Sequence, residues 1–108
     1  MAKYASMIIE GDSMEPTYSA GDWLMGRWAK YKLTGLNRIK SGDVVVIERD
    51  EQPGIFYVKR ISEVRKSGDA SPAVYLLSDN SAGTDSRTWG WLPITNVRAK
   101  IVFRMKRG

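Results

Sequence analysis

The sequence contains neither cysteine nor histidine. The first absence excludes disulfide bonds, thiolate zinc sites and cysteine nucleophiles. The second excludes histidine-ligated metals and every catalytic triad with a histidine base. A nucleophile must therefore be Ser, Thr, Lys or a carboxylate, and a general base must be Lys, Asp, Glu or Tyr. We expect no metal and no cofactor.

Long apolar segments are also missing. The longest uninterrupted aliphatic run is Val44 to Ile47, far below the roughly 18 residues that a membrane helix needs. We therefore expect a chain that neither spans a membrane nor carries a signal peptide, and that works in the cytoplasm. The alternative is a membrane-associated protein on the extracytoplasmic face, whose anchor lies outside this sequence.

The pattern of the chain predicts one mainly β domain over residues 1–108. Most segments alternate apolar and polar residues with period two, and no window of eleven or more residues shows a helical stripe. We expect a short helical turn at Ser13–Tyr18 and loops at Lys66–Pro72 and Asn80–Arg87. The predicted strands are Tyr4–Glu10, Asp22–Trp28, Asp43–Glu48, Phe56–Val64, Val74–Ser78 and Val97–Met105.

Two residues are candidates for nucleophilic catalysis. Ser13 lies between a strand end and a proline, and Gly11 before it would let a substrate backbone come close. Lys59 shares its strand face with Tyr57 and Ile61, and a lysine acts as a base near neutral pH only if desolvation lowers its pKa from about 10.4 to about 7 or 8. By themselves, the two residues also fit a capping serine in an ordinary turn and an exposed strand lysine.

Three motifs in order resemble the type I signal peptidase family of Ser/Lys dyad serine peptidases. They are Gly-Asp-Ser13-Met-Glu-Pro-Thr, Tyr-Val-Lys59-Arg-Ile, and the stretch from Asp79-Asn80 to Asp85-Ser86-Arg87-Thr-Trp-Gly. The resemblance covers about Ile8 to Ile101 and implies one peptidase domain with the signal peptidase/LexA-like antiparallel β fold and few short helical turns. It implies that Ser13 attacks a peptide carbonyl and that neutral Lys59 takes its proton.

The resemblance also assigns supporting residues. The Ser13 backbone N–H would hold the oxyanion, without the side-chain hydroxyl that some relatives carry at the position of Gly11. Relatives usually have a serine two residues before the aspartate of the third motif, where it bonds the catalytic lysine. This chain has Gly83 there, with Ser81 or Thr84 as substitutes. An ion pair between Asp85 and Arg87, with Ser86 between them, would hold this loop near the dyad.

The expected substrate is a protein precursor bound as an extended strand. The resemblance implies pockets that favour small residues such as alanine before the cut, although every lining residue would also serve as ordinary core. These residues are Ile9, Met14, Tyr18, Tyr57 and Val58.

Several functions remain open at this stage. The short chain resembles the nickel superoxide dismutase maturation proteases, which trim a propeptide, but an anchored signal peptidase acting on secretory preproteins would look the same. A LexA-like self-cleaving regulator shares the first two motifs and lacks the third. A non-enzymatic β module that binds nucleic acid would suit the net charge of +5, but no nucleic-acid-binding motif is present. The basic face of Val97–Met105 could instead contact a membrane.

Overall fold

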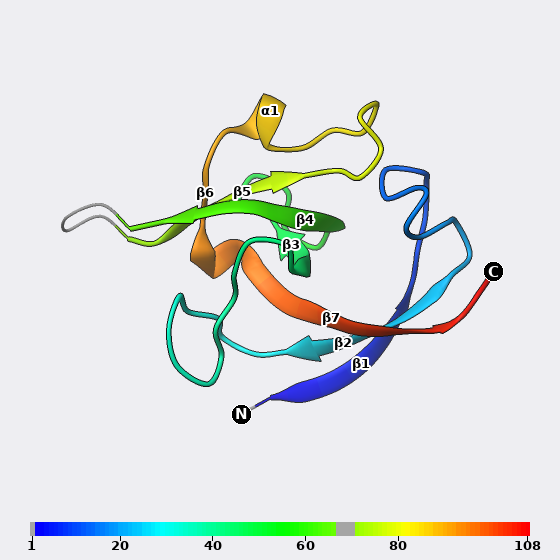
Figure 1. Cartoon of the computed structure of the whole chain (residues 1–108), viewed down its shortest axis with the longest axis horizontal. Coiled ribbons are helices and arrows are strands. Elements are labelled where there is room, and N and C mark those ends of the chain that lie inside the picture. Colours follow the sequence, from blue (N-terminus) through cyan, green and yellow to red (C-terminus); the bar gives the residue numbers. More distant parts are fainter. Residues whose placement is uncertain (1, 67–70) are drawn as a thin grey trace.

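The computed structural model describes residues 2–66 and 71–108, in which seven strands form one curled antiparallel sheet (Figure 1). The sheet order is β1-β2-β7-β3-β4-β5-β6. The predicted mainly β fold is confirmed, whereas most of the loop predicted at Lys66–Pro72 lies outside the described residues. The strands are β1 (Lys3–Ile8), β2 (Trp23–Trp28), β3 (Val44–Glu48), β4 (Phe56–Arg65), β5 (Ala73–Leu77), β6 (Leu92–Pro93) and β7 (Val97–Lys106).

Each of the six predicted strands is present with its ends displaced by at most two residues. Three short elements were not predicted: β6, the helix α1 (Ser86–Trp89) and a 3-10 turn at Ile94–Asn96. A two-residue strand is too short to show a period. The start of α1 overlaps the loop predicted at Asn80–Arg87, because the Asp85 side chain caps it by accepting the backbone N–H of Arg87.

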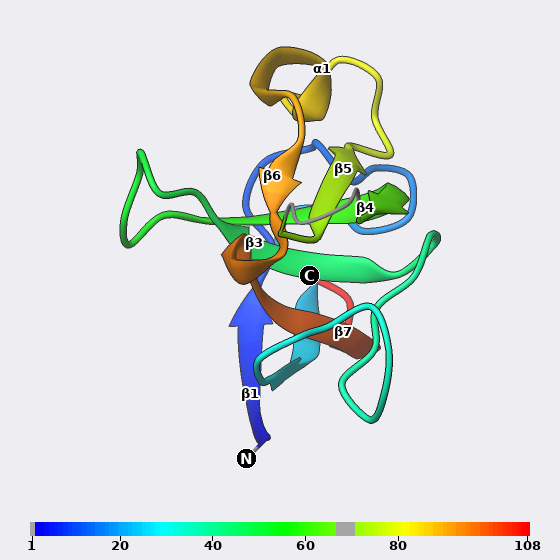
Figure 2. The same cartoon turned by 90° about the vertical axis from the view of Figure 1, so that its left-hand side faces the viewer.

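Strand β3 lies in the middle of the sheet and is buried on both faces. Val45 and Ile47 belong to one hydrophobic cluster, and Val44 and Val46 to a second. This explains why the longest aliphatic run in the sequence is a central strand without polar alternation. The sheet curls strongly, so that β1 at one end runs across the direction of β4 (Figure 2).

Strand β7 alternates buried and more exposed residues only in its first half. Val97, Ala99 and Ile101 are buried, but Phe103 and Met105 are exposed. The register with β2 shifts here, since Gly26 pairs with Ile101 and Met25 with Phe103, which leaves Val102 as an extra residue. Such a bulge breaks the alternation of faces. Phe103 and Met105 are therefore not on the buried face, although they continue the spacing of Val97, Ala99 and Ile101.

Two loops from distant parts of the sequence meet beside the sheet. One joins β1 to β2, and the other follows β5 (Figure 1). The backbone N–H of Asn80 donates to the carbonyl of Ser13 at 2.9 Å, and the Asn80 side chain donates to the carbonyl of Asp12 at 3.1 Å. The predicted helical turn is a single turn, closed by Tyr18 N–H on the carbonyl of Met14. These contacts place Ser13 against the third motif.

Within the described residues, no helix has the length and apolar character needed to cross a membrane.

Candidate active site

Lys59 lies on β4 with only 2% of its surface exposed. As predicted, Tyr57 and Ile61 share its side of the sheet, since both contact the first hydrophobic cluster, while Val58 packs against the second. The Lys59 Nζ atom lies 5.6 Å from the centroid of the Tyr57 ring and 5.9 Å from that of Trp89. The contribution of Trp89 was not predicted, because α1 brings it from thirty positions away in the chain.

This environment changes the pKa of Lys59. Burial lowers the pKa because the ammonium form loses its hydration, and the positive charge of Arg87 adds to this effect. The negative charge of Asp85 opposes it. The net result is a lowered pKa, so the amine is more readily neutral than an exposed lysine and can accept a proton.

The Lys59 amine donates a hydrogen bond to the Oγ of Ser78 at 2.9 Å. Ser81 or Thr84 was expected in this role, but the hydroxyl that bonds Lys59 is that of Ser78. The Thr84 carbonyl faces the Ser78 hydroxyl at 3.4 Å, and the Ser81 carbonyl accepts from Arg87. The correct residue could have been found, because Ser78 continues the buried alternation of Val74 and Leu76 along β5.

Ser13 lies in the loop between β1 and β2 and is half-buried. Gly11 precedes it with φ of 74°, a backbone conformation that favours glycine, and a Cβ there would meet no described atom within 4 Å. A Cβ built on Gly83 would lie 2.9 Å from the Ser13 Cβ and 2.5 Å from the Ser78 Oγ. Ser13 and the hydroxyl partner of Lys59 therefore both lie against Gly83.

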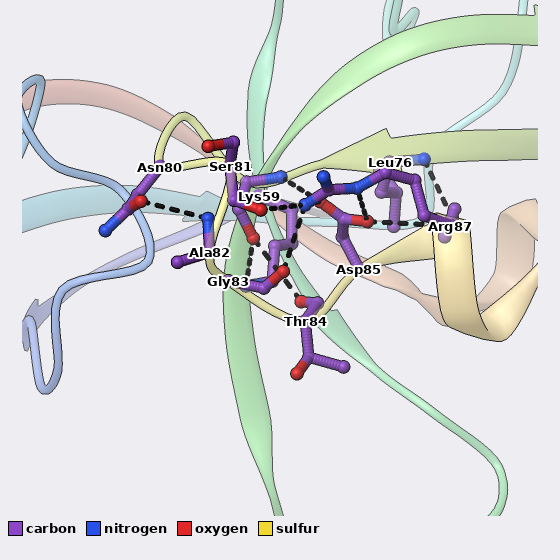
Figure 3. Close-up of polar contacts among 11 residues, drawn as sticks. Lys59, Leu76, Asn80, Ser81, Ala82, Gly83, Thr84, Asp85 and Arg87 are labelled. Carbon is purple, nitrogen blue, oxygen red and sulfur yellow. Dashed lines mark hydrogen bonds and ion pairs between the residues drawn. The ribbon is translucent and has the colours of Figure 1, made fainter.

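The third motif braces this region through Asp85, as Figure 3 shows. The predicted ion pair is present: Arg87 Nε donates to Asp85 Oδ1 at 2.9 Å. Arg87 Nη2 also donates to the carbonyls of Ser81 and Gly83. The second oxygen of Asp85 accepts the backbone N–H of Ser78 at 2.7 Å, and the Ser86 hydroxyl accepts the N–H of Leu76 at 2.9 Å.

A small pocket of about 110 Å³ adjoins Ser13. Four of the five expected pocket residues line it, and Ile8, Glu10 and Phe56 were missed. Tyr18 lies elsewhere, packed against the second cluster with the Arg104 guanidinium 5.7 Å from its ring centroid. The four expected residues in the wall are Ile9, Met14, Tyr57 and Val58.

The donor set of the site does not resemble a metal centre. Across residues 2–66 and 71–108, no group of three or more His, Cys, Asp or Glu side chains is placed to hold a metal ion. The site contains a desolvated amine bonded to the Ser78 hydroxyl, and Ser13 lies across Gly83 from that hydroxyl, beside a small pocket.

One comparison with known proteins identifies the family. Residues 1–65 match the model of "Signal peptidase, peptidase S26", a segment that includes Ser13 and Lys59 and ends before Ser78. No curated protein matches the chain. The matched segment makes up more than half of the sequence, and the chain therefore belongs to the signal peptidase family S26, whose members are serine peptidases.

Proposed function

We propose that this protein is an endopeptidase that removes an N-terminal leader or propeptide from a protein precursor, with Ser13 as nucleophile and Lys59 as general base. The observation that carries the proposal is the buried amine of Lys59, which has a lowered pKa and shares the surroundings of Gly83 with Ser13 through its bond to Ser78. Family membership supports the same reaction class.

In the proposed reaction, Ser13 Oγ attacks the carbonyl carbon of the scissile peptide bond while its proton passes to neutral Lys59. The resulting ammonium then protonates the leaving amine, which departs as the C–N bond breaks and leaves an ester on Ser13. Lys59, neutral again, takes a proton from water as the water attacks the ester. The carboxylic acid product departs, and Ser13 regains its hydroxyl proton from Lys59.

The negative charge that develops on the carbonyl oxygen needs a hydrogen-bond donor. The backbone N–H of Ser13 is the proposed donor. Gly11 contributes no side-chain hydroxyl, but its missing side chain leaves room for the substrate backbone. The transition state would then depend on backbone donors and not on a second side chain.

The pocket walls support an extended substrate that is cut after a small residue. They come from residues 8–10 at the end of β1 and residues 56–58 at the start of β4, so two strand segments flank the place next to Ser13. A peptide laid along them could pair with exposed backbone groups, as in strand addition. The proposed specificity is for alanine or a residue of similar size before the cut.

The precursor could belong to one of two classes, each with its own location. A superoxide dismutase precursor that loses a propeptide would place the enzyme in the cytoplasm. A secretory preprotein that loses its leader would place it at the outer face of a membrane. Incubation of the protein with precursors of both classes, followed by mass spectrometry of the new N-termini, distinguishes them.

The general test uses a library of proteome-derived peptides with the wild type, Ser13→Ala and Ser81→Ala. We expect the wild type to generate new N-termini after small residues and Ser13→Ala to generate none, with an unchanged melting temperature because only one hydroxyl in a loop is lost. Ser81 is an exposed serine of the third motif, so Ser81→Ala serves as the matched control and should cleave normally. Cleavage by Ser13→Ala at the wild-type rate would disprove the nucleophile.

A further inference from the structure

A second cavity lies at the end of the sheet away from Ser13, between the chain that follows β2 and the start of β7 (Figure 1). Its volume is about 360 Å³, against about 110 Å³ for the pocket beside Ser13, and the two have no lining residue in common. Small-molecule sites occupy about 300 to 1,000 Å³. The backbone N–H of Ala29 donates to the Arg98 carbonyl at 3.3 Å and joins the two walls of the cavity, so its shape does not depend on a ligand.

The floor of this cavity is apolar. Tyr31, Ile94 and Val97 line it, and all three are buried members of the first hydrophobic cluster. The Tyr31 hydroxyl already donates to the carbonyl of Arg27, so the polar end of this side chain needs no further partner. The floor therefore suits the hydrocarbon part of a ligand.

The rim of the cavity is positively charged. Lys30, Lys32 and Arg98 line it, and none of the described aspartates or glutamates does. Arg98 has one anionic partner, since its Nε lies 3.2 Å from Glu48 Oε1. Over residues 2–66 and 71–108, neither lysine forms an ion pair. Two ammonium groups at the mouth of an apolar cavity produce a positive potential that attracts an anion.

We propose that this cavity binds a small apolar carboxylate, with its hydrocarbon part on the buried floor and its carboxylate at the amines of Lys30 and Lys32. An exposed lysine paired with a carboxylate contributes little by itself, and an apolar floor by itself accepts neutral molecules equally well. Only a ligand with both parts uses both surfaces. The inference does not rest on the proposed peptidase reaction, because the cavity has no residue in common with the pocket beside Ser13.

Two sources supply this chemistry. One is a free arylalkanoic or alkanoic acid, and the other is the C-terminus of a peptide whose last residue is apolar. The probe for the first is 4-phenylbutyrate. The probe for the second is an acetylated tripeptide that ends in phenylalanine, with the same peptide amidated at its C-terminus as its control.

The test is a titration of the ¹⁵N-labelled protein, followed by ¹H–¹⁵N spectra. With 4-phenylbutyrate we expect saturable shifts of the backbone amides of Lys30, Thr95 and Arg98, with a dissociation constant on the order of 1 mM. The neutral 4-phenyl-1-butanol should bind about three- to tenfold more weakly, because it lacks the charge. Acetate lacks the hydrocarbon part and should cause no saturable shift of these amides. Added salt should weaken the binding of 4-phenylbutyrate and leave that of the alcohol unchanged.

One pair of variants tests the rim. Lys30→Gln/Lys32→Gln should weaken 4-phenylbutyrate about three- to tenfold and leave the alcohol unaffected, because the floor is intact. Lys3→Gln/Lys106→Gln is the matched control, since it removes two exposed lysines outside the cavity and lowers the net charge equally. It should bind 4-phenylbutyrate as the wild type does.

The outcomes decide the proposal. Saturable shifts around the cavity that depend on the carboxylate and on the two rim lysines support it, and the probe that binds identifies the source. The absence of shifts with either probe at about ten times the expected dissociation constant overturns it. It is also overturned if the alcohol binds as tightly as the acid, or if both double variants weaken the acid equally, since net charge alone would then explain binding. Shifts confined to residues 8–10 and 56–58 would overturn it as well, because they place the ligand beside Ser13.

Discussion

Arg87 binds both carboxylate oxygens of Asp85, with Nε 2.9 Å from Oδ1 and Nη2 3.0 Å from Oδ2. Asp85 is 1% exposed, and it also accepts the backbone N–H groups of Arg87 and Ser78. Burial raises the pKa of Asp85, but these hydrogen bonds outweigh it and lower the pKa to about 2. The pair therefore couples the stability of the loop to pH.

This coupling predicts a loss of stability in acid. The pKa of Asp85 falls from 3.8 in the unfolded chain to about 2 in the fold, which contributes about 2 kcal/mol to the free energy of unfolding. Because the folded-state pKa is depressed, the contribution is complete above about pH 4 and is lost as the pH falls toward 2. Urea unfolding of wild type and Asp85→Asn between pH 2 and 6 should show a difference in stability that shrinks toward acid.

Glu51→Gln is the control for this experiment. Glu51 pairs with Arg49 at 2.7 Å, but its side chain is 65% exposed, and such pairs contribute little. The difference between the wild type and Glu51→Gln should stay small and nearly constant across the range. If the difference in free energy of unfolding between Asp85→Asn and the wild type is also constant across this range, the charge of Asp85 does not stabilise the fold.

Lys59 should give the pH dependence of activity its shape. Because the amine must be neutral, kcat/KM should rise about tenfold per pH unit below the folded-state pKa and should not level off by pH 7. Lys59→Arg keeps the charge but cannot act as a base in this range. It should lose as much activity as Lys59→Ala on the same peptide, whereas an active Lys59→Arg enzyme would rule out the base.

The buried amine of Lys59 should also lower the free energy of unfolding. Lys59→Met removes a buried amine and keeps an unbranched side chain of similar length, so we expect it to raise the free energy of unfolding by about 1 kcal/mol at pH 7, or the Tm by about 5 °C. The lowered pKa means that the folded wild type binds fewer protons than the unfolded chain above that pKa. The free energy of unfolding of the wild type therefore rises toward pH 10. The difference in this free energy between Lys59→Met and the wild type should become smaller over the same range.

Differential scanning calorimetry at pH 7, 8, 9 and 10 measures this effect. Lys30→Met is the control, because Lys30 is exposed. The difference in free energy of unfolding between Lys30→Met and the wild type should not change with pH. A Lys59→Met protein less stable than the wild type at every pH would mean that the Ser78 hydrogen bond outweighs the burial of the amine.

Val58 should help to set the residue accepted before the cut. It lines the pocket next to Ser13 and is half-buried, so Val58→Ala widens the pocket at a cost of about 1 to 2 kcal/mol in stability. Peptides with alanine, valine and leucine before the cut should be cleaved in that order of preference by the wild type. The variant should shift toward valine by about tenfold relative to alanine.

Val102→Ala provides the comparison, because Val102 is exposed on β7. Val102→Ala should cleave the alanine, valine and leucine peptides with the same relative rates as the wild type. Competition between the three peptides in one reaction measures these rates. An unchanged preference in Val58→Ala would place the specificity pocket elsewhere.

Local sequence determined much of the fold. Period-two alternation located six strands, and the unbroken run Val44–Ile47 is the strand buried on both faces. The same alternation put Tyr57 and Ile61 on the side of Lys59, because neighbours on a strand face are set by the backbone alone. Because the chain has neither histidine nor cysteine, only a few residue types can serve as its base and nucleophile.

Tertiary structure alone decided which side chains meet. The hydroxyl partner of Lys59 is Ser78, because the pairing of β4 with β5 sets Arg60 opposite Leu77 and so brings the next residues together. The bulge at Val102 and the approach of Trp89 depend likewise on the register and on the path of a loop. A linear pattern carries the period of each strand, but the register between strands follows from how all the strands pack around one core.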